Sequence, residues 1–500
     1  MSEAATLGSL GLAGLAHAGP APDAEAIVAG LAVDSRKVKD GFVFVAIKGT
    51  QLDGAEFIQF ALRQGAVAVI CTEEGLETAG ATVEKIMVPF LLVREPREVL
   101  ARAAARFYGT QPSNMIAVTG TNGKTSVADF TRQIWAACGC KAAAFGTTGV
   151  AGEGFEEPLA MTTPEPIQLH ELLARLAAQG CTHAAMEASS HGLAQHRVDG
   201  VRFRAACLTN ITRDHMDYHT DHDDYVGAKM RLFHNVLPHG GTAVLNVDDP
   251  AFDLARMATP ARNVMGVGRG EAADLRILGA EYRSDGQDVT FEFQGKRHMA
   301  RLDLIGGFQA DNALLAAGLA IATDVQPQDA FAALEKLTGV RGRMEHVATR
   351  ANGATVYVDY AHTPDALATA LTAIRPHVSG RLIVVGGAGG DRDPGKRPLM
   401  GQAMAENADA VVVTDDNPRS EDPTAIRMAV LEGAPEADNI GDRAEAILSG
   451  VDMLRNPGDC LLIAGKGHEQ GQEIAGVQHP FDDASQARAA VAALDGEETI

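Results

Sequence analysis

The sequence has 500 residues, which at about 150 residues per domain suffices for about three domains. Hydrophobic residues make up 46% of the chain and charged residues 22%, as in folded globular proteins, so the composition excludes wholesale disorder. The formal net charge of −22 argues against a general nucleic-acid or anionic-membrane binder, and we expect neither as a partner. Six scattered cysteines without a CxxC pair exclude a disulfide scaffold and favour a reducing, cytoplasmic compartment.

The apolar stretch of residues 7–18 is interpreted as the opening of the first domain. A secretory signal is the alternative, because the stretch ends in Ala16-His17-Ala18, but Glu3 and no Lys or Arg precedes it. No apolar run approaches the ~18 residues that a membrane-spanning helix needs. We therefore expect a soluble protein.

Strand-like apolar runs alternate with Ala- and Leu-rich helical stretches along the chain, which predicts an α/β protein. Two segments divide the chain: a Gly- and Pro-marked loop at residues 109–114, and residues 338–343, which follow a helix predicted to end at Leu337. The predicted domains are residues 1–108, 109–338 and 339–500. In the third domain, residues 356–359, 382–386, 410–414 and 461–464 predict buried parallel strands, whose carboxyl ends are the places to look for ligand-binding residues.

A glycine-rich loop follows the predicted strand at residues 115–118 and precedes a helical pattern. Such loops fold backbone N–H groups around phosphate oxygens, with Lys124 reaching the β- and γ-phosphates and the Thr125 hydroxyl ligating Mg²⁺. The spacing is GxxGK[ST], shorter than the usual GxxxxGK[ST], because Val118 stands where the longer motif needs glycine. A glycine-rich turn with a chance lysine is the alternative. The strand before the loop, the helix after it and the Lys-Thr pair at its end together favour an ATP-binding loop. The predicted ATP-binding residues are Gly120, Thr121, Asn122, Gly123, Lys124, Thr125 and Ser126.

This shortened loop, preceded by Val-Thr, resembles that of the Mur ligase superfamily, which includes the folylpolyglutamate synthases. Its members join an amino acid to a carboxylate at the expense of ATP. The resemblance implies three α/β domains: an N-terminal UDP-binding domain, a central P-loop ATPase-like domain and a C-terminal Rossmann-like domain.

Two further blocks resemble the central domain of the Mur ligases: residues 187–197, with the pattern ExSSHGLxQHR, and residues 209–219, with the pattern TNxxRDHxDYH. The resemblance implies that Glu187 and His215 help to hold a second Mg²⁺ and that Lys229 is carbamylated and ligates metal. From the residues alone, Lys229 is equally an ordinary helix lysine. Zinc is disfavoured, because the nearby donors are mainly oxygens and the ATP loop calls for Mg²⁺.

Residues 34–49 begin with Asp34-Ser35-Arg36 and are similar to the segment that opens the muramyl-peptide ligases. By itself this segment is a strand pair with a polar corner and predicts no function. By resemblance, a set of polar residues binds UDP-N-acetylmuramoyl-L-alanyl-D-glutamate: Ser35, Thr162, Thr163, Ser189, Gln195 and Arg197. Arg197 suits a carboxylate or pyrophosphate because its guanidinium binds such groups bidentately.

Arg343 and Asp359 resemble family residues that complete the ATP site when the domains close, and Asn312 resembles a family position on another side of that site. The segment at residues 307–312 departs from the commoner GxFNxxN, because Gln309 replaces the first asparagine. Asn312 itself is present.

The loop Thr414-Asp-Asp-Asn-Pro-Arg419 follows a predicted strand. Asp-Asn-Pro is good turn chemistry, which is the alternative explanation. Loops at residues 390–393 and 465–469 also follow strands of the same domain, so the three should converge. DNPR resembles the motif of family members that add meso-diaminopimelate, whose binding residues would be Arg392, Asp416, Asn417, Pro418, Arg419, Gly465 and Glu469.

We therefore predict an ATP-dependent, Mg²⁺-requiring ligase of the cytoplasm that takes three small-molecule substrates: ATP, UDP-N-acetylmuramoyl-L-alanyl-D-glutamate and meso-diaminopimelate. A monomer is expected. By the same resemblance, Lys124, Lys229, Glu187 and His215 are the catalytic residues, and Thr125, Glu187, His215 and the Lys229 carbamate ligate metal. The alternatives are a folylpolyglutamate synthase, which gives no reason for the Asp34-Ser35-Arg36 and DNPR motifs, and a nucleotide-binding regulator without ligase chemistry.

Overall fold

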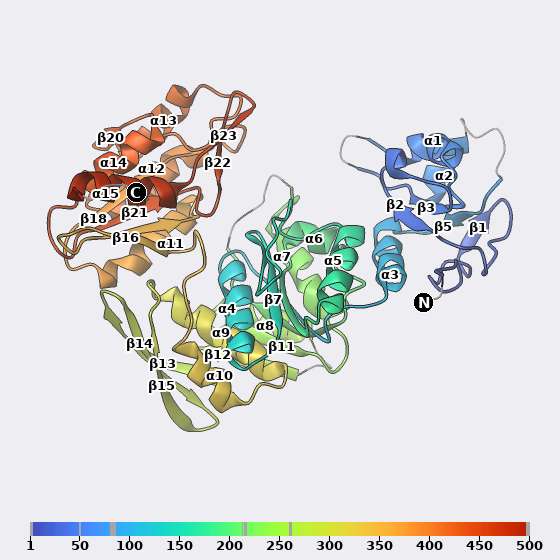
Figure 1. Ribbon diagram of the computed structural model, residues 1–500, viewed down its shortest axis with the longest axis horizontal. Helices are drawn as coiled ribbons and strands as arrows, with labels where there is room; N and C mark the ends of the chain where they lie inside the picture. Colours follow the sequence, from blue (N-terminus) through green and yellow to red (C-terminus); the bar gives the residue numbers. More distant parts are fainter. Residues whose placement is uncertain are drawn as a thin grey trace.

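The structure is a computed structural model that describes residues 4–49, 52–80, 87–212, 214, 218–259 and 263–496. Three β-sheets with helices on both faces follow one another along the chain (Figure 1), which confirms the predicted α/β class. Each of the three lies within one of the ranges 1–108, 109–338 and 339–500, called here the N-terminal, central and C-terminal domains. The boundaries between these ranges stay predictions.

The N-terminal sheet has the strand order β1-β5-β4-β3-β2, with β1 antiparallel and the other pairs parallel. Strand β4 is buried along its whole length, as expected for a strand covered on both faces. The strands are β1 (Ala16–Ala18), β2 (Gly30–Ala32), β3 (Phe42–Val45), β4 (Ala68–Cys71) and β5 (Phe90–Leu92). The helices are η1 (Ser35–Lys37), η2 (Gly54–Phe57), α1 (Ile58–Arg63), α2 (Glu73–Gly80) and α3 (Pro96–Tyr108).

The central sheet has the order β15-β14-β13-β12-β11-β10-β6-β9-β7-β8 and is parallel from β7 to β13 through β9, β6, β10, β11 and β12. Its strands are β6 (Asn114–Thr119), β7 (Ala142–Gly146), β8 (Gly149–Ala151), β9 (His183–Glu187), β10 (Phe203–Leu208), β11 (Thr242–Asn246), β12 (Asn263–Gly268), β13 (Leu275–Arg283), β14 (Gly286–Phe293) and β15 (Lys296–Leu302).

Helices α4 (Lys124–Ala137), α9 (Phe308–Ala322) and α10 (Pro327–Leu334) pack on one face of the central sheet. Helices α5 (Pro166–Ala178), α6 (Ser190–Ala194), α7 (His222–Arg231), the π-helix η3 (Leu232–Val236) and α8 (Phe252–Met257) pack on the other. Helix α10 ends at Leu334, three residues before the predicted end at Leu337. The chain tightens there into i→i+3 bonds, from the Lys336 N–H to the Ala333 carbonyl and from the Leu337 N–H to the Leu334 carbonyl.

The C-terminal sheet has the order β16-β17-β21-β18-β19-β20, and its predicted parallel strands are confirmed as β17, β21, β18 and β19. Its strands are β16 (Glu345–Thr349), β17 (Thr355–Asp359), β18 (Leu382–Gly386), β19 (Ala410–Val413), β20 (Asp438–Asn439) and β21 (Cys460–Ala464). The separate β22–β23 hairpin joins β22 (Gly471–Ile474) to β23 (Val477–Pro480). The helices are α11 (Pro364–Ile374), η4 (Arg375–His377), α12 (Lys396–Asn407), α13 (Pro423–Leu431), α14 (Arg443–Asp452) and α15 (Asp483–Asp495).

The parallel arrangement decides where the functional segments lie. Because β9, β6 and β10 are parallel neighbours, Glu187 at the end of β9 lies at the same sheet edge as the loop that follows β6. In the C-terminal sheet, the segments after β18, β19 and β21 share an edge in the same way. Ligand sites of open α/β sheets form at such edges.

His377 joins the central and C-terminal domains. The buried ring, at the end of η4, accepts the Gly306 N–H at Nε2 (3.1 Å) and lies 2.6 Å from the Arg283 carbonyl through Nδ1. Ile305 belongs to the same hydrophobic cluster as Leu371 and Leu382 of the C-terminal domain. The segment that leads into α9 is therefore anchored to both domains.

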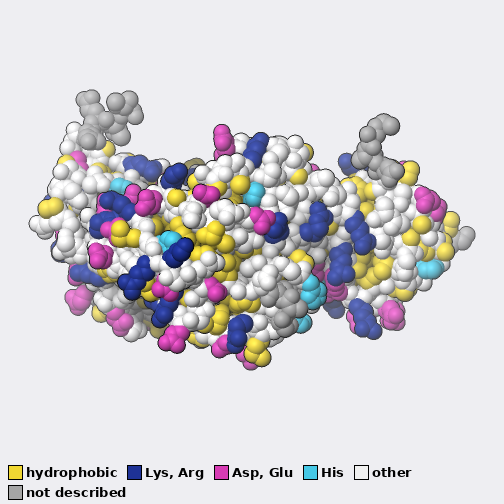
Figure 2. Space-filling view, turned by 90° about the horizontal axis from the view of Figure 1, so that it is seen from below, with side chains coloured by type: hydrophobic (Ala, Val, Ile, Leu, Met, Phe, Trp, Pro, Cys, Tyr) yellow, Lys and Arg dark blue, Asp and Glu magenta, His cyan; other side chains and the backbone are white. Residues whose placement is uncertain are grey.

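None of the helices that the structure describes combines the length and the apolar character of a membrane-spanning segment. The molecule carries a formal charge of −22, yet Lys and Arg side chains are interspersed with Asp and Glu side chains on the face that Figure 2 presents. On that face the negative charge does not form one continuous acidic surface.

Arg443 and Asp483 form a fully buried ion pair at the centre of the C-terminal domain. Both carboxylate oxygens of Asp483 accept from the guanidinium at 2.7 Å, and the guanidinium also donates to the carbonyls of Ala464 (3.0 Å) and Asp415 (3.5 Å). The pair thereby ties the first turns of α14 and α15 to the ends of β21 and β19.

Replacing Arg443 by Met is expected to lower the free energy of unfolding by about 3–5 kcal/mol, because Asp483 is left as a buried, uncompensated carboxylate. Arg455→Met is the matched control. The Arg455–Asp452 pair is 2.5 Å long but exposed, with side chains 67% and 46% accessible, so its loss should cost about 0–1 kcal/mol. Urea unfolding followed by circular dichroism measures both; equal losses would contradict this account of the pair.

Candidate active site

The phosphate loop connects β6 to α4 and carries the predicted residues Gly120 to Ser126. Gly123 lies at φ +84°, and a Cβ placed there would lie 2.6 Å from the Asn312 side-chain oxygen. Only glycine fits this position without strain, since other residues rarely adopt that conformation. Helix α4 begins at Lys124, so its positive dipole end faces the loop.

Two lysines converge on one carbonyl of this loop. The Lys124 Nζ donates to the carbonyls of Gly120 (3.0 Å) and Thr121 (2.8 Å), and the buried Lys229 Nζ donates to the Gly120 carbonyl at 2.7 Å. Burial lowers the pKa of Lys124, and it lowers the pKa of Lys229 well below its ordinary value, with the charge of Lys124 adding to the effect. The nearby Asp214 opposes both shifts. Both amino groups thus lie at the carbonyls of the phosphate loop.

Glu187 is the acceptor at the centre of the site. Its buried carboxylate accepts from the Thr125 hydroxyl (3.0 Å) and from the Thr147 N–H (2.8 Å) and hydroxyl (3.2 Å). The Thr125 hydroxyl and the Glu187 carboxylate are hard oxygen donors side by side, which fits Mg²⁺. Lys229 in its amine form offers a cation no oxygen, and His215 lies outside the described residues.

Tyr225 supports the loop from α7. Its hydroxyl is hydrogen-bonded to the Thr121 hydroxyl at 2.8 Å, and its ring lies 4.6 Å from the Lys229 Nζ. Helix α7 therefore brings Tyr225 and Lys229, four residues apart on one face, to the same loop.

The predicted muramyl-dipeptide residues of the central domain form one network with Glu187. Thr163 donates to the Glu187 carbonyl (3.0 Å), accepts the Ser189 N–H (3.0 Å) and is hydrogen-bonded to the Ser189 hydroxyl (3.1 Å). The Thr162 and Thr147 hydroxyls lie 3.0 Å apart. These threonines thus continue the site from Glu187 along the sheet edge.

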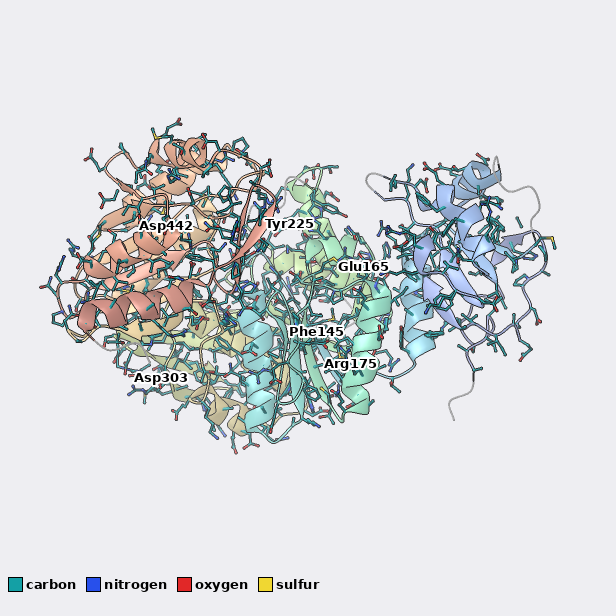
Figure 3. The ribbon with its side chains drawn as sticks, turned by 45° about the horizontal axis from the view of Figure 1, so that its top comes forward. Phe145, Glu165, Arg175, Tyr225, Asp303 and Asp442 are labelled. Atoms are coloured by element: carbon teal, nitrogen blue, oxygen red, sulfur yellow. The ribbon has the colours of Figure 1, made fainter. Side chains whose placement is uncertain are left out.

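Arg197 extends that network toward the N-terminal domain. Its guanidinium donates to the Thr163 carbonyl (2.7 Å) and to Gln195 Oε1 (2.7 and 3.2 Å) and pairs with Glu165 at 2.8 Å. Figure 3 shows Glu165 on the side of the central domain that faces the N-terminal domain. Ser35 lies apart from this group, buried in η1 of the N-terminal domain.

Arg343 reaches from the start of the C-terminal domain to the phosphate loop. A guanidinium N–H donates to the Thr125 hydroxyl at 3.4 Å, and the group lies 4.3 Å from the Tyr360 ring centre. Asp359 accepts the Met344 N–H at 2.7 Å, which holds the turn that carries Arg343. Burial raises the pKa of Asp359, while Arg343 opposes the shift.

The unusual Gln309 contacts Asn312. The buried Gln309 Oε1 accepts from the Asn312 amide at 3.0 Å, which turns the Asn312 oxygen toward Gly123. The substitution of Gln for the commoner Asn therefore leaves Asn312 held against the phosphate loop.

Lys466 organises the predicted amino-acid site, and the sequence interpretation assigned it no role. Its fully buried Nζ donates to Asn417 Oδ1 (2.9 Å) and lies 3.3 Å from a carboxylate oxygen of Glu469 and 3.6 Å from one of Asp416. The Asn417 amide donates to the same Glu469 oxygen at 3.0 Å. A Cβ at Gly465 would lie 2.7 Å from an Asp416 carboxylate oxygen, so the backbone must approach closely there.

Arg419 and Arg392 lie in different environments. Arg419 has φ +54° and donates to the Gly390 carbonyl at 2.7 Å, and its Nε lies 3.5 Å from a Glu473 carboxylate oxygen. Pro418 before it is buried. Arg392 is exposed and donates to the Asp391 carbonyl at 3.3 Å, so the structure does not join it to the cluster around Lys466.

Several contributors were missed because their partners are distant in the sequence. Tyr225 and Asp214 lie in motifs from which other residues were predicted as site residues. Lys466 lies between the predicted residues Gly465 and Glu469. The signal available for Lys466 was its position directly after an all-apolar buried strand.

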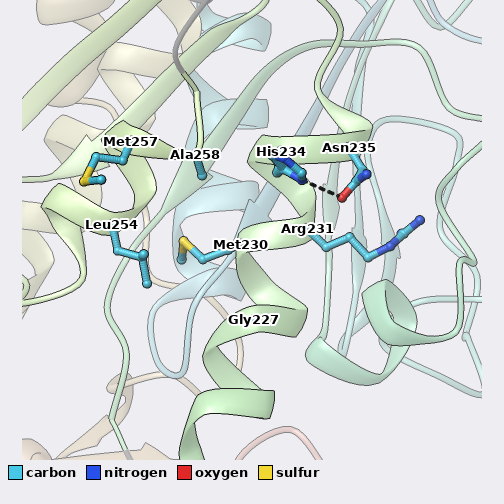
Figure 4. Close-up of a pocket in the computed structure, with 8 residues that line it drawn as sticks. All are labelled: Gly227, Met230, Arg231, His234, Asn235, Leu254, Met257 and Ala258. Atoms are coloured by element: carbon cyan, nitrogen blue, oxygen red, sulfur yellow. Dashed lines mark hydrogen bonds between the residues drawn. The ribbon is translucent and has the colours of Figure 1, made fainter.

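A separate cavity of about 400 Å³ lies between α7, η3 and α8 (Figure 4). Gly227 and Arg231, two residues on either side of Lys229, line it together with Met230, so it opens on a different face of α7. None of the predicted site residues lines this cavity.

The chain matches sequence models of three family domains: Mur ligase family, catalytic domain, over residues 27–108; Mur ligase middle domain over 118–320; and Mur ligase, glutamate ligase domain, over 342–467. It is 51% identical over 469 residues to a protein of Chelativorans sp. (strain BNC1) named UDP-N-acetylmuramoyl-L-alanyl-D-glutamate--2,6-diaminopimelate ligase, a match that covers 93% of this chain and 95% of that protein. A protein of the same name from Agrobacterium fabrum is 51% identical over 471 residues, 94% of each chain.

A solved structure titled with that same name has a TM-score of 0.71 and 33% identity and covers 98% of this chain and 99% of its own. A Mycobacterium tuberculosis folylpolyglutamate synthase complexed with ADP is 19% identical, with a TM-score of 0.62 over 81% of this chain and 96% of its own. The latter is a likeness of fold.

The phosphate loop, the paired lysines and the Thr125–Glu187 contact, with Arg343 reaching in from a second α/β domain, define a phosphate-loop protein whose site lies between two domains. The chain also shares about half of its residues with these relatives over nearly its whole length, which shows its family. The chain belongs to the Mur ligase family.

Gly123→Ala is expected to weaken ATP binding about ten- to a hundred-fold, because the added methyl displaces either the loop or Asn312. Gly139→Ala is the matched control: Gly139 also has a left-handed backbone, at φ +80°, but a Cβ there meets no described heavy atom within 4 Å. Calorimetric titration with ATP compares the two variants. Equal affinities would show that the loop does not depend on this contact.

Proposed function

We propose that this protein joins meso-diaminopimelate to the D-glutamate side-chain carboxylate of UDP-N-acetylmuramoyl-L-alanyl-D-glutamate, using ATP, in cytoplasmic synthesis of peptidoglycan precursors. Curated relatives that carry the corresponding name match nearly all of this chain at about half identity, which supports the proposal. The observation that carries it is the charged cluster at the carboxyl ends of β19 and β21, where Asp416, Arg419 and Glu469 offer both signs of charge.

ATP is assigned to the phosphate loop, with Lys124 and Arg343 facing its phosphates and Asn312 holding the loop. Thr125 and Glu187 would hold Mg²⁺, together with His215 and the Lys229 carbamate. When bound, this cation neutralises phosphate charge.

The reaction follows from the chemistry of a carboxylate, which is a poor acyl donor until it is activated. A carboxylate oxygen of the substrate attacks the γ-phosphorus, ADP leaves, and an acyl phosphate forms. Lys124 stabilises the charge on the transferred phosphoryl group. The free amine of diaminopimelate then attacks the acyl carbon, its nitrogen loses a proton, and the tetrahedral intermediate expels phosphate to leave an amide.

The UDP-linked dipeptide is assigned to Ser35, Thr162, Thr163, Ser189, Gln195 and Arg197. Thr163 and Ser189 lie next to Glu187, so a carboxylate held by them is close to the phosphate loop. Ser35 would contact the nucleotide from the N-terminal domain. Arg197 suits an anionic group of the substrate, although it already pairs with Glu165.

Meso-diaminopimelate is assigned to Arg392, Asp416, Asn417, Pro418, Arg419, Gly465 and Glu469. This amino acid is lysine with a second carboxylate at its far end, so selection requires a group that binds that carboxylate. The Arg419 guanidinium can do so bidentately. Asp416 and Glu469 carry the charge to receive the neighbouring ammonium, and Lys466 holds both.

The Lys229 carbamate is proposed on chemical grounds. Only a neutral amine attacks CO₂: the ammonium first releases one proton, the N–C bond then forms with loss of a second proton from nitrogen, and the cationic side chain becomes a carboxylate. The lowered pKa of Lys229 raises the neutral fraction near pH 7 and so favours this step. The product supplies oxygen donors where the ammonium repels a cation.

The direct test measures phosphate release with ATP, the UDP-linked dipeptide and a panel of amino acids. We expect release only when the dipeptide and meso-diaminopimelate are both present, with L-lysine a poor substitute. Release with a folate and glutamate would favour a folylpolyglutamate synthase. Nucleotide binding without release under any combination would favour a regulator.

Lys229→Ala is expected to be inactive and to regain part of its activity in formate, whose oxygens replace those of the carbamate. Lys124→Ala is the matched control, since it should also be inactive, but an anion cannot replace its cation. Phosphate release measured across formate concentrations separates the two variants. Near-wild-type activity of Lys229→Ala would contradict the carbamate.

A further inference from the structure

The β22–β23 hairpin forms a clamp on the loop that carries the predicted amino-acid ligands. The Gln472 side chain donates to the Asp416 carbonyl at 2.7 Å, and the Glu473 N–H donates to Asn417 Oδ1 at 3.0 Å. The Arg419 N–H donates to the Glu473 carbonyl at 3.0 Å, and the Ala475 N–H donates to the Arg419 carbonyl at 2.7 Å. These backbone bonds hold Arg419 in its left-handed conformation.

The clamp also places a carboxylate against the guanidinium. A Glu473 carboxylate oxygen lies 3.5 Å from Arg419 Nε, while another guanidinium N–H is committed to the Gly390 carbonyl at 2.7 Å. The Glu473 side chain is 40% exposed and that of Arg419 is 23% exposed. Glu473 can therefore turn toward solvent without breaking the backbone bonds of the hairpin.

The other charges near Arg419 have partners of their own. The Asp391 carboxylate accepts from the Ser420 N–H (3.1 Å) and hydroxyl (2.6 Å). Lys466 is held by Asn417 and Glu469 at the other end of the cluster. The charge of Arg419 acts on Asp391 as well, but less than the hydrogen bonds from Ser420 do. Within the part of the chain that the structure describes, Glu473 is the carboxylate that forms an ion pair with Arg419, so it is placed to exchange with a carboxylate of a ligand.

We propose that Glu473 is the internal counter-ion of Arg419 and a specificity-determining residue for the amino-acid substrate; this inference rests on the proposed function. The far carboxylate of diaminopimelate has to displace Glu473 from the guanidinium, which weakens binding of the correct substrate. When lysine is bound, Glu473 stays paired with Arg419. Without Glu473, the guanidinium would be left without an anion, and this free-energy cost would disfavour lysine. Glu473 therefore limits both affinity and discrimination.

Glu473→Gln tests this directly, because it removes the charge and keeps the shape and the backbone contacts. The KM for meso-diaminopimelate should fall about two- to five-fold, the worth of a partly exposed ion pair, and kcat/KM for lysine relative to diaminopimelate should fall as well. The KM values for ATP and the UDP-linked dipeptide should stay unchanged. Glu436→Gln, an exposed site in the same domain, is the control for the general loss of one negative charge.

An Arg419→Ala background completes the test: there, Glu473→Gln should alter the KM for diaminopimelate no more than Glu436→Gln does. A KM unchanged by Glu473→Gln, or lowered equally by the control, overturns the inference while leaving the proposed function intact. A wild-type protein that does not use diaminopimelate overturns both. Glu473→Ala, with thermal unfolding of each variant, separates a misfolded protein from a true result, because loss of folding raises every KM or abolishes activity.

Discussion

The Gly120 carbonyl is the point on which the site depends. Lys124 and Lys229, from helices α4 and α7, both donate to it, so two buried amino groups share one acceptor. Burial disfavours the charge of both lysines and lowers the pKa of each; the charge of Lys124 lowers the pKa of Lys229 further, and the charge of Arg343 does the same at Lys124. In the proposed function, the phosphates of ATP would compensate the charge of Lys124, and the proposed carbamate would replace the charge of Lys229 by an anion. The same geometry that looks unfavourable without ligands therefore prepares the site for phosphate.

The C-terminal domain also contains a buried lysine, but there side-chain oxygens compensate its charge. Lys466 is as deeply buried as Lys229, but it is surrounded by Asp416, Asn417 and Glu469. These oxygens compensate the charge of Lys466, and the Arg443–Asp483 pair connects to the end of β21 through the Ala464 carbonyl. A cluster of fixed charges of both signs suits an amino acid, whereas Lys124, which donates to backbone carbonyls, suits the phosphates of a nucleotide.

The sequence predicted those features that depend on consecutive residues, namely the phosphate loop and the buried strands. The phosphate loop was found because its glycines, lysine and hydroxyl are consecutive, and the four C-terminal parallel strands were found because each is an apolar run bounded by polar turns. The end of α10 was misplaced by three residues because 3₁₀-type bonds finish that segment.

Contacts between distant segments were not predictable in this way. Tyr225 with Thr121, Gln309 with Asn312, and Glu473 with Arg419 depend on tertiary folding. The roles of the predicted site residues stay predictions, and His215 lies outside the described residues.

The measurement that tests the account most directly follows oxygen from the substrate carboxylate. UDP-N-acetylmuramoyl-L-alanyl-D-glutamate labelled with ¹⁸O in the D-glutamate side-chain carboxylate is turned over with ATP and meso-diaminopimelate, and the phosphate is analysed by mass spectrometry. An acyl phosphate transfers one carboxylate oxygen to phosphorus, so the account predicts one ¹⁸O atom in each phosphate released. Amide formation with unlabelled phosphate would contradict it, because the carboxylate would then have been activated without attack on the γ-phosphorus.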